Sequence, residues 1–348
     1  MPPREGDFTI ASMMGPDRRA ARRGSAWALG VALSVAAVSG APASMGAQSA
    51  SPRAGYAWAD VARWRFRHPE RRTKAVVLAG SIGAHPNRPY ARLLHEWCPA
   101  TEVQNLSQVG RGAPALYRSF RRRVLRNPRV PIGAPDTELW VIWGGGLNSV
   151  ATPHRNARAL HDLTRTAHRR GIGVVALTLT PWGEDDVMSG GQGAHLARST
   201  RLVVDDVLGR LTPDQALGQA AAQRRPGVDW EPAEQPDVVV DLYDSRLRDP
   251  EAPVREVTRI EARLQRDRRW RRRAGRLPEQ DRKTRLAEDA RLLAEMPRWY
   301  LRPRYRGFDH VHLNADGHRV VADTVCPRLP ASWGCTCPPP HGAGAEAP

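Results

Sequence analysis

The chain has almost no lysine and little cysteine, and both shortages limit the kinds of binding site it can contain. Only Lys74 and Lys283 are lysines among 53 basic residues, and 4 residues are cysteine. No Cys-x-x-Cys pair is present, which argues against a cysteine-rich zinc site. The main apolar run, residues 26–38, is too short to span a bilayer.

The composition is nevertheless that of a folded protein. With 348 residues, 41% of them hydrophobic and 26% charged, the chain is too apolar to be a disordered tail and long enough to bury a core. The length fits one α/β domain with insertions, or two domains. A formal charge of +17 would suggest a polyanionic partner. Because the excess is almost entirely arginine, which a high-GC coding bias also produces, we expect no nucleic-acid partner.

The N-terminal residues have the order of an export signal. Arginines between positions 18 and 23 precede the apolar run, and Ala41-Pro42-Ala43 follows it. A short buried helix is the alternative interpretation. We predict a signal peptide over residues 1–43, a linker over 44–73, and a secreted or periplasmic protein without a stable membrane span.

An exported chain can keep disulfides, and the cysteines form an even set. They are Cys98, Cys326, Cys335 and Cys337, and all three connectivities are open. We expect the bonds to hold a C-terminal tail, residues 331–348, to the body of the protein. Cys98 is the candidate anchor, and the tail is expected to be flexible elsewhere.

Short β-branched runs alternate with segments of helical periodicity. The runs lack proline and are nearly continuous in hydrophobicity, as in strands buried on both faces of a parallel sheet. The alternation predicts a doubly wound α/β sandwich over residues 74–330. The expected strands are 75–79, 102–106, 139–143, 174–179 and 238–242, and the expected helices between them are 89–97, 114–125, 155–169 and 194–208.

A charge-dense stretch at 246–306 interrupts the alternation. It contains the arginine-rich run 268–273 and a second helical segment at 281–295. We interpret it as an Arg-rich helical insertion, most simply a solvated hairpin, with a lid or a surface for an anionic polymer as the alternative. Asn314 then offers an N-cap for a last helix that ends at Val325.

Small and polar residues follow three of the expected strands. Ser81 follows the first strand in a Gly-Ser-Ile-Gly turn, Gly110 ends the loop after the second, and Asn148 follows the third in Gly-Leu-Asn. Ligands of open parallel sheets bind outside the carboxyl ends of the strands. We therefore expect these three residues to share one site.

A serine nucleophile needs a base within reach and a third group that orients the base. Asp309 lies three residues before His312, so a single loop can hold both. His310 and His318 are alternative bases. A metal site built from the acidic and histidine residues of 309–316 is a further alternative, although no second cluster completes it.

Taken in this order, the residues resemble the SGNH (GDSL-type) serine hydrolase family. The resemblance covers residues 74–323, with the insertion outside it. It implies a three-layer α/β/α sandwich around a parallel, flavodoxin-like doubly wound sheet. It also implies catalysis without a cofactor.

The resemblance assigns a role to each of the five residues. Ser81 would be the nucleophile, and His312 the base oriented by Asp309. The oxyanion hole would consist of the backbone N–H groups of Ser81 and Gly110 and the side chain of Asn148.

Two positions depart from the pattern of the family. Gly80 stands where an aspartate usually precedes the nucleophile, and Ser149 stands where an aspartate usually follows the asparagine. In relatives these carboxylates help to fix loop geometry. Neither position supplies a proton, a nucleophile or an oxyanion donor, so we expect the chemistry to survive.

The sequence thus predicts an exported serine esterase that acts on carboxylic esters, such as O-acetyl groups of polysaccharides or lipid esters. Trp182, just past the fourth strand, is a candidate wall of the substrate pocket, with simple packing as the alternative. The nucleophile elbow of α/β-hydrolases is disfavoured because Ser81 follows the first strand. The other alternative is a catalytically degenerate protein of the same fold that binds carbohydrate or polyanions at the cell surface.

Overall fold

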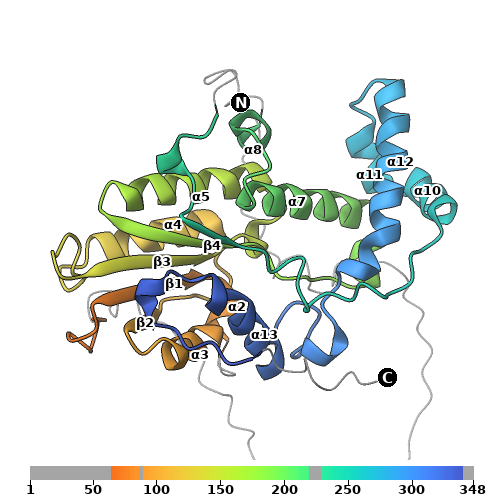
Figure 1. Cartoon of the computed structure of the whole chain (residues 1–348). Coiled ribbons are helices and arrows are strands. Elements are labelled where there is room, and N and C mark those ends of the chain that lie inside the picture. Colours follow the sequence, from red (N-terminus) through yellow and green to blue (C-terminus); the bar gives the residue numbers. More distant parts are fainter. Residues whose placement is uncertain (1–63, 86–88, 219–228, 340–348) are drawn as a thin grey trace, which may run out of the picture.

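The computed structural model describes residues 64–85, 89–218 and 229–339 (Figure 1). The predicted signal peptide, 1–43, and most of the predicted linker lie outside the described residues. Within the described ranges, no helix combines the length and the apolar character needed to cross a lipid bilayer.

Five parallel strands form one sheet in the order β2-β1-β3-β4-β5. All five predicted strands are present, with ends that differ by at most two residues. The order is that of a flavodoxin-like doubly wound sheet, which confirms the predicted fold class. The strands are β1 (Thr73–Ala79), β2 (Thr101–Asn105), β3 (Glu138–Gly144), β4 (Ile172–Leu177) and β5 (Val238–Val240).

Alternate side chains of the strands face two helical layers. In β1, Val77 packs in a cluster with residues of α3 and α13, whereas Val76 and Leu78 pack with residues of α4 and α5. Figure 1 shows these two groups of helices on opposite sides of the sheet, which gives the expected three layers. The helices are α3 (Tyr90–Trp97), α4 (Ala113–Ser119), α5 (Pro153–His168), α7 (Gly191–Val207) and α13 (Ala315–Val325).

Local signals set several helix ends. The side chain of Asn314 accepts a hydrogen bond of 2.9 Å from the N–H of Gly317, so Asn314 caps α13 as predicted. The helix expected at 114–125 is α-helical only at its start and continues as a π-helix, η2 (Phe120–Leu125). The shorter elements are α2 (Ser81–Ala84), α6 (Asp185–Met188), α8 (Pro213–Leu217), η3 (Leu147–Ser149), η4 (Pro232–Glu234), η5 (Met296–Trp299), η6 (Pro303–Tyr305), η7 (Cys326–Arg328) and η8 (Ala331–Trp333).

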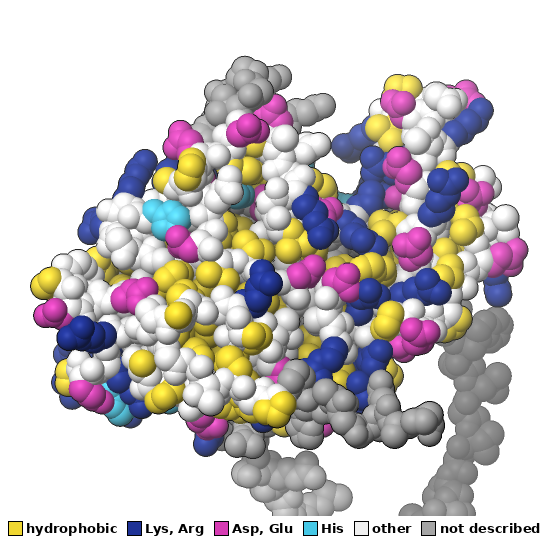
Figure 2. Space-filling view, in the orientation of Figure 1, with side chains coloured by type: hydrophobic (Ala, Val, Ile, Leu, Met, Phe, Trp, Pro, Cys, Tyr) yellow, Lys and Arg dark blue, Asp and Glu magenta, His cyan; other side chains and the backbone are white. Residues whose placement is uncertain are grey.

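The insertion forms an arm of helices beside α7 (Figure 1). Figure 2 shows basic and acidic side chains interspersed over the arm, as expected for a solvated surface. Its inner face is different, because Trp270 and Leu293 are buried in one apolar cluster with Leu196 of α7. The insertion therefore docks on the body and is not a fully solvated hairpin. Its helices are α10 (Val257–Arg266), α11 (Arg268–Ala274) and α12 (Glu279–Glu295).

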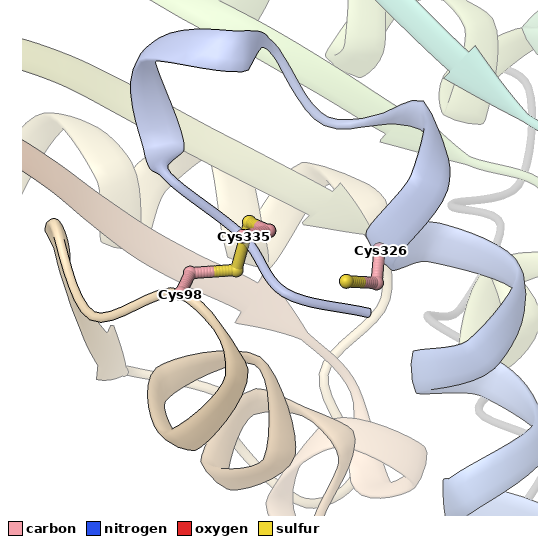
Figure 3. A group of neighbouring side chains, drawn as sticks. All are labelled: Cys98, Cys326 and Cys335. Carbon is pink, nitrogen blue, oxygen red and sulfur yellow. A yellow bond between two sulfur atoms is a disulfide. The ribbon is translucent and has the colours of Figure 1, made fainter. Parts of the chain in front are cut away.

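Two disulfides hold the C-terminal segment. Cys98, at the end of α3, is bonded to Cys335, and Cys326 is bonded to Cys337. The expected anchor at Cys98 is thereby confirmed. Figure 3 shows Cys326 close to the Cys98–Cys335 bond, and the three sulfur atoms lie within 4.8 Å of one another. Since metal ions bind thiolates, these oxidised sulfurs are not ligands.

The prediction of a flexible tail is wrong for residues 331–337. Trp333 is fully buried in the core, and its carbonyl accepts a hydrogen bond of 3.0 Å from the Thr101 hydroxyl. The N–H of Thr336 donates to the carbonyl of Trp97 at 2.8 Å. Residues 340–348 lie outside the described residues.

Breaking the Cys98–Cys335 bond should destabilise the fold more than breaking the Cys326–Cys337 bond. The first bond joins residues 237 positions apart and the second joins residues 11 apart. Loop-closure entropy then gives losses of about 5 and about 3 kcal/mol in the free energy of unfolding. Urea unfolding of the Cys98→Ser/Cys335→Ser and Cys326→Ser/Cys337→Ser variants measures both. Equal losses would contradict the entropic account.

Candidate active site

Three of the predicted site residues lie at the carboxyl edge of the sheet. Ser81 opens α2 directly after β1, Asn148 lies in η3 after β3, and Gly110 lies in the turn after β2. The strand order reverses between β1 and β3, and doubly wound sheets bind ligands at that point. The topology therefore gathers these residues where a site is expected.

Asn148 packs against Gly80, the residue before the candidate nucleophile. A Cβ atom at Gly80 would lie 2.8 Å from Nδ2 of Asn148 and 3.2 Å from the carbonyl oxygen of Arg111. Backbone and amide can approach this closely only where there is no side chain. The glycine that departs from the family pattern thus makes room for the Asn148 amide beside Ser81.

Ser149, the second departure, fixes the same loop by hydrogen bonds. Its hydroxyl oxygen accepts from the N–H of Ala113 at 2.9 Å and donates to the side-chain oxygen of Asn156. These bonds tie the loop after β3 to the first residues of α4 and to α5. A serine therefore holds this loop without the usual carboxylate.

The loop after β2 is bonded to the turn that carries Ser81. The hydroxyl oxygen of Ser107 accepts from the N–H of Ala79 at 3.1 Å, and the side chain of Asn105 donates to the carbonyl of Gly83 at 2.7 Å. Gly110 has a φ of +72°, a left-handed conformation that favours glycine. Its loop therefore bends beside the nucleophile turn.

Ser81 itself is 8% exposed. Its hydroxyl makes no hydrogen bond within the part of the chain that the structure describes. Its N–H belongs to the first turn of α2, where N–H groups have no acceptor inside the helix. Neither group is engaged by another residue that the structure describes.

Asp309 makes three hydrogen bonds, two of them with His312, and so orients its ring. One carboxylate oxygen lies 2.8 Å from Nδ1 of His312, and the other accepts from the N–H groups of His312 at 2.7 Å and Val311 at 2.8 Å. Burial alone would raise the pKa of Asp309, but the bonds from these two N–H groups and from the ring outweigh it, so the pKa lies below its usual value. The ionised carboxylate accepts from Nδ1–H and leaves Nε2 free to act as a base.

The loop that carries His312 lies against the end of α2. His85, which follows the helix opened by Ser81, has its ring centroid 5.9 Å from that of His312. No hydrogen bond joins Ser81 to His312 among the described residues. Catalytic hydrogen bonds of this kind often form only in the complex with substrate. The structure thus places the hydrogen-bonded pair of Asp309 and His312 beside α2, the helix that begins with Ser81.

The two alternative bases have other surroundings. Nδ1 of His310 lies 2.9 Å from the carboxylate of Glu184, and its Nε2 is buried. His318 is fully buried between the rings of His85 and Tyr90, and burial lowers its pKa to about 4. Neither ring contacts Asp309, so His312 is the histidine with the carboxylate partner that the sequence predicted.

Three residues of this region were not identified from the sequence. His85 lies against His312, Phe308 stacks on His312 with ring centroids 4.7 Å apart, and Val109 precedes Gly110. Phe308 is 73% exposed and Val109 is 68% exposed, which is unusual for large apolar side chains. The sequence shows that Phe308 precedes Asp309 and that Val109 precedes Gly110. It does not show that these two apolar side chains are exposed.

Trp182 does not wall an open pocket. Its side chain is 1% exposed, and its indole N–H donates to the hydroxyl of Thr200 at 3.2 Å. The alternative, a packing tryptophan, is therefore the correct one. A cavity beside Ala79 and Ile82, which flank the Ser81 turn, has a volume of only about 20 Å³.

Solved structures with similar folds include several hydrolases. A GDSL-like lipase from Bacteroides thetaiotaomicron shares 12% identity with a TM-score of 0.41, over 78% of this chain and 93% of the lipase. An acetyl xylan esterase shares 16% identity with a TM-score of 0.40, over 74% of this chain and 100% of the esterase. An SGNH-hydrolase family esterase shares 14% identity with a TM-score of 0.30, over 46% of this chain and 84% of that esterase.

Two of these three names carry the GDSL or SGNH label, the family that the sequence motifs resemble. No family model matches the chain, and no curated protein sequence matches it significantly. The roles of the site residues therefore depend on their geometry in this chain.

The Asp309→Asn variant should be less stable than the wild type at neutral pH but not in acid. Asp309 has a pKa below the usual value of about 3.9. Its ionised form therefore stabilises the fold above that value, and the contribution is lost as the pH falls through the lowered pKa. We expect a difference of about 1–2 kcal/mol in the free energy of unfolding at neutral pH. Urea unfolding across the pH range measures it, and a difference independent of pH would refute an ionised, hydrogen-bonded Asp309.

Proposed function

We propose that the chain is an exported serine esterase that hydrolyses carboxylic esters through an acyl-enzyme on Ser81. The observation that carries the proposal is the Asp309–His312 pair, held at 2.8 Å on a loop that lies against the helix opened by Ser81. Asn148 lies on the other side of the same turn, against Gly80. A nucleophile, an oriented base and a side-chain amide thus lie at one edge of the sheet.

In the first step, the Ser81 hydroxyl oxygen attacks the ester carbonyl carbon while Nε2 of His312 takes the hydroxyl proton. The negative charge that develops on the carbonyl oxygen is stabilised by the N–H groups of Ser81 and Gly110 and by the Asn148 amide. Donors of this kind contribute about 3 kcal/mol each in the transition state. Asp309 stabilises the imidazolium and holds its tautomer.

In the second step, the tetrahedral intermediate collapses and the bond from carbon to the leaving oxygen breaks. His312 returns the proton to that oxygen, so the alcohol leaves neutral and the acyl group stays on Ser81. A water molecule then attacks the acyl-enzyme with His312 again as the base, which releases the acid and restores the hydroxyl. These steps need no cofactor.

Short acyl groups are the favoured substrates. The cavity of about 20 Å³ beside Ala79 and Ile82 is lined by neither Ser81 nor His312, so it does not set the acyl length. The exposed side chains of Phe308 and Val109 offer a shallow apolar surface instead. This favours acetyl esters, such as those on polysaccharides, over long-chain lipid esters.

Export is supported by two independent features. The predicted signal peptide covers residues 1–43, and all four cysteines form disulfides, which persist in oxidising compartments. We therefore propose that the enzyme acts in the periplasm or outside the cell.

The experiment is a panel of p-nitrophenyl esters with increasing acyl length, tested on the wild type and the Ser81→Ala variant. We expect the wild type to prefer acetate and the variant to lose at least about a thousandfold in kcat/KM. Ser332→Ala is the matched control because Ser332 is exposed. Its backbone carbonyl, not its hydroxyl, accepts a hydrogen bond from the Thr73 hydroxyl.

Ser81→Ala turnover equal to that of the wild type would reject Ser81 catalysis and leave the non-catalytic binding protein as the function. Preference for long acyl chains would leave the mechanism intact and reject the short-acyl assignment.

A further inference from the structure

A cavity of about 720 Å³ lies between the body of the protein and the insertion. Its walls are residues 151–155, which lead into α5, the middle of α7, and one side of α12. Figure 2 shows Lys and Arg side chains gathered around the notch between the body and the arm. The volume is in the range of small-ligand sites, about 300–1,000 Å³.

Basic side chains dominate the lining of this cavity. Asp205 is the one carboxylate among its described lining residues, and it is already paired with Arg210 at 3.1 Å. Arg285 also lies 3.6 Å from the carboxylate of Glu288, which is outside the lining. The lining itself still has more arginines than carboxylates, which favours a negatively charged ligand. The arginines that line it are Arg155, Arg198, Arg201 and Arg285.

Contacts outside the cavity hold two of these guanidinium groups in place. Arg201 stacks over the ring of Trp299 at 4.3 Å, and its Nε has no acceptor among the described residues. Arg198 pairs with the buried carboxylate of Asp289, which also accepts from the indole N–H of Trp270 at 2.7 Å. Because each guanidinium has five donors, these contacts orient the groups, and terminal N–H groups, not the buried Nε of Arg201, are left for a ligand.

The insertion is required for this cavity. Arg285 and Leu292 come from α12, and the network of Arg198 and Asp289 fastens that helix to α7. His195, also in the lining, shows the effect of the surroundings: burial, Arg273 and Arg198 lower its pKa to about 4, so its ring is neutral at physiological pH.

The cavity begins close to the candidate oxyanion hole. Residues 151–155 begin two positions after the end of η3, which contains Asn148, and the N–H of Thr152 donates to the carbonyl of Ser149 at 2.9 Å. The cavity and the candidate oxyanion hole are therefore linked by one short segment of chain, residues 149–152.

We propose that this cavity binds the anionic part of the ester substrate, a carboxylate or phosphate on a compact body that contacts Leu202 and Leu292. Guanidinium groups match both anions with paired hydrogen bonds. That the ligand is part of the substrate depends on the proposed esterase function. Anion binding itself depends only on the cavity.

Calorimetric titration of the full chain with glucuronate, inorganic phosphate and glucose tests binding directly. We expect heat from one or both anions and none from glucose, and weaker binding as salt is added. Arg285→Gln and Arg201→Gln should each weaken anion binding by about tenfold, because each removes a charge-assisted contact. Arg282→Gln is the matched control, since Arg282 is exposed on the same helix and outside the lining. Urea unfolding of each variant shows whether it folds as the wild type does.

Hydrolysis of two acetyl esters, O-acetylglucuronate and O-acetylglucose, tests the link to catalysis. We expect the wild type to favour the charged ester, and the ratio of the two kcat/KM values to fall by about tenfold in Arg285→Gln but not in Arg282→Gln. Anion binding that depends on Arg285 without any ester hydrolysis would support the pocket and reject the esterase.

Ester hydrolysis through Ser81 without anion binding, or with equal binding in Arg285→Gln and Arg282→Gln, would overturn the pocket and leave the esterase standing. Heat from glucose equal to that from glucuronate would also overturn it.

Discussion

Because the five strands are parallel, their carboxyl ends lie at one edge of the sheet, and the proposed chemistry depends on this constraint. It brings Ser81 and Asn148, which follow the adjacent strands β1 and β3, to the same edge of the sheet. The residues at the far end of the chain reach this edge because the loop before α13 is held in place. The N–H of Gly183 donates to the carbonyl of His310 at 3.1 Å, and Asn314 caps the helix that follows.

Within this frame, small side chains set the geometry of the site. Gly80 leaves space for the Asn148 amide, and Ser149 fixes the loop that presents it. Both positions depart from the family pattern, and both have a physical role in this chain. The insertion adds a second candidate site, because its docking on α7 forms an arginine-lined cavity next to the segment that follows Asn148.

The strands could be predicted from the sequence because burial on both faces leaves continuous β-branched runs, a local signal. The cap at Asn314 is local as well. The burial of Trp182 and Trp333 could not be predicted, because it depends on Thr200 and on the neighbourhood of Thr101, which only the folded chain brings near.

In the site too, some residues could be identified from local sequence signals and others only from contacts in the folded chain. Position after a strand identified Ser81, Gly110 and Asn148, and spacing identified the pairing of Asp309 with His312, which the structure has as a hydrogen bond. Their catalytic roles stay predictions. His85 and Phe308 were missed because their contacts with His312 join separate segments or depend on exposure. The disulfide pairing was open for a similar reason, since spacing alone allows three connectivities.

The proposed function requires that His312 activates the Ser81 hydroxyl. Covalent labelling of the intact protein with a fluorophosphonate, followed by mass spectrometry of its peptides, tests this most directly. We predict a single label on Ser81 that is lost in His312→Ala and after unfolding. A label on another residue, or labelling of Ser81 at the same rate in His312→Ala, would contradict it.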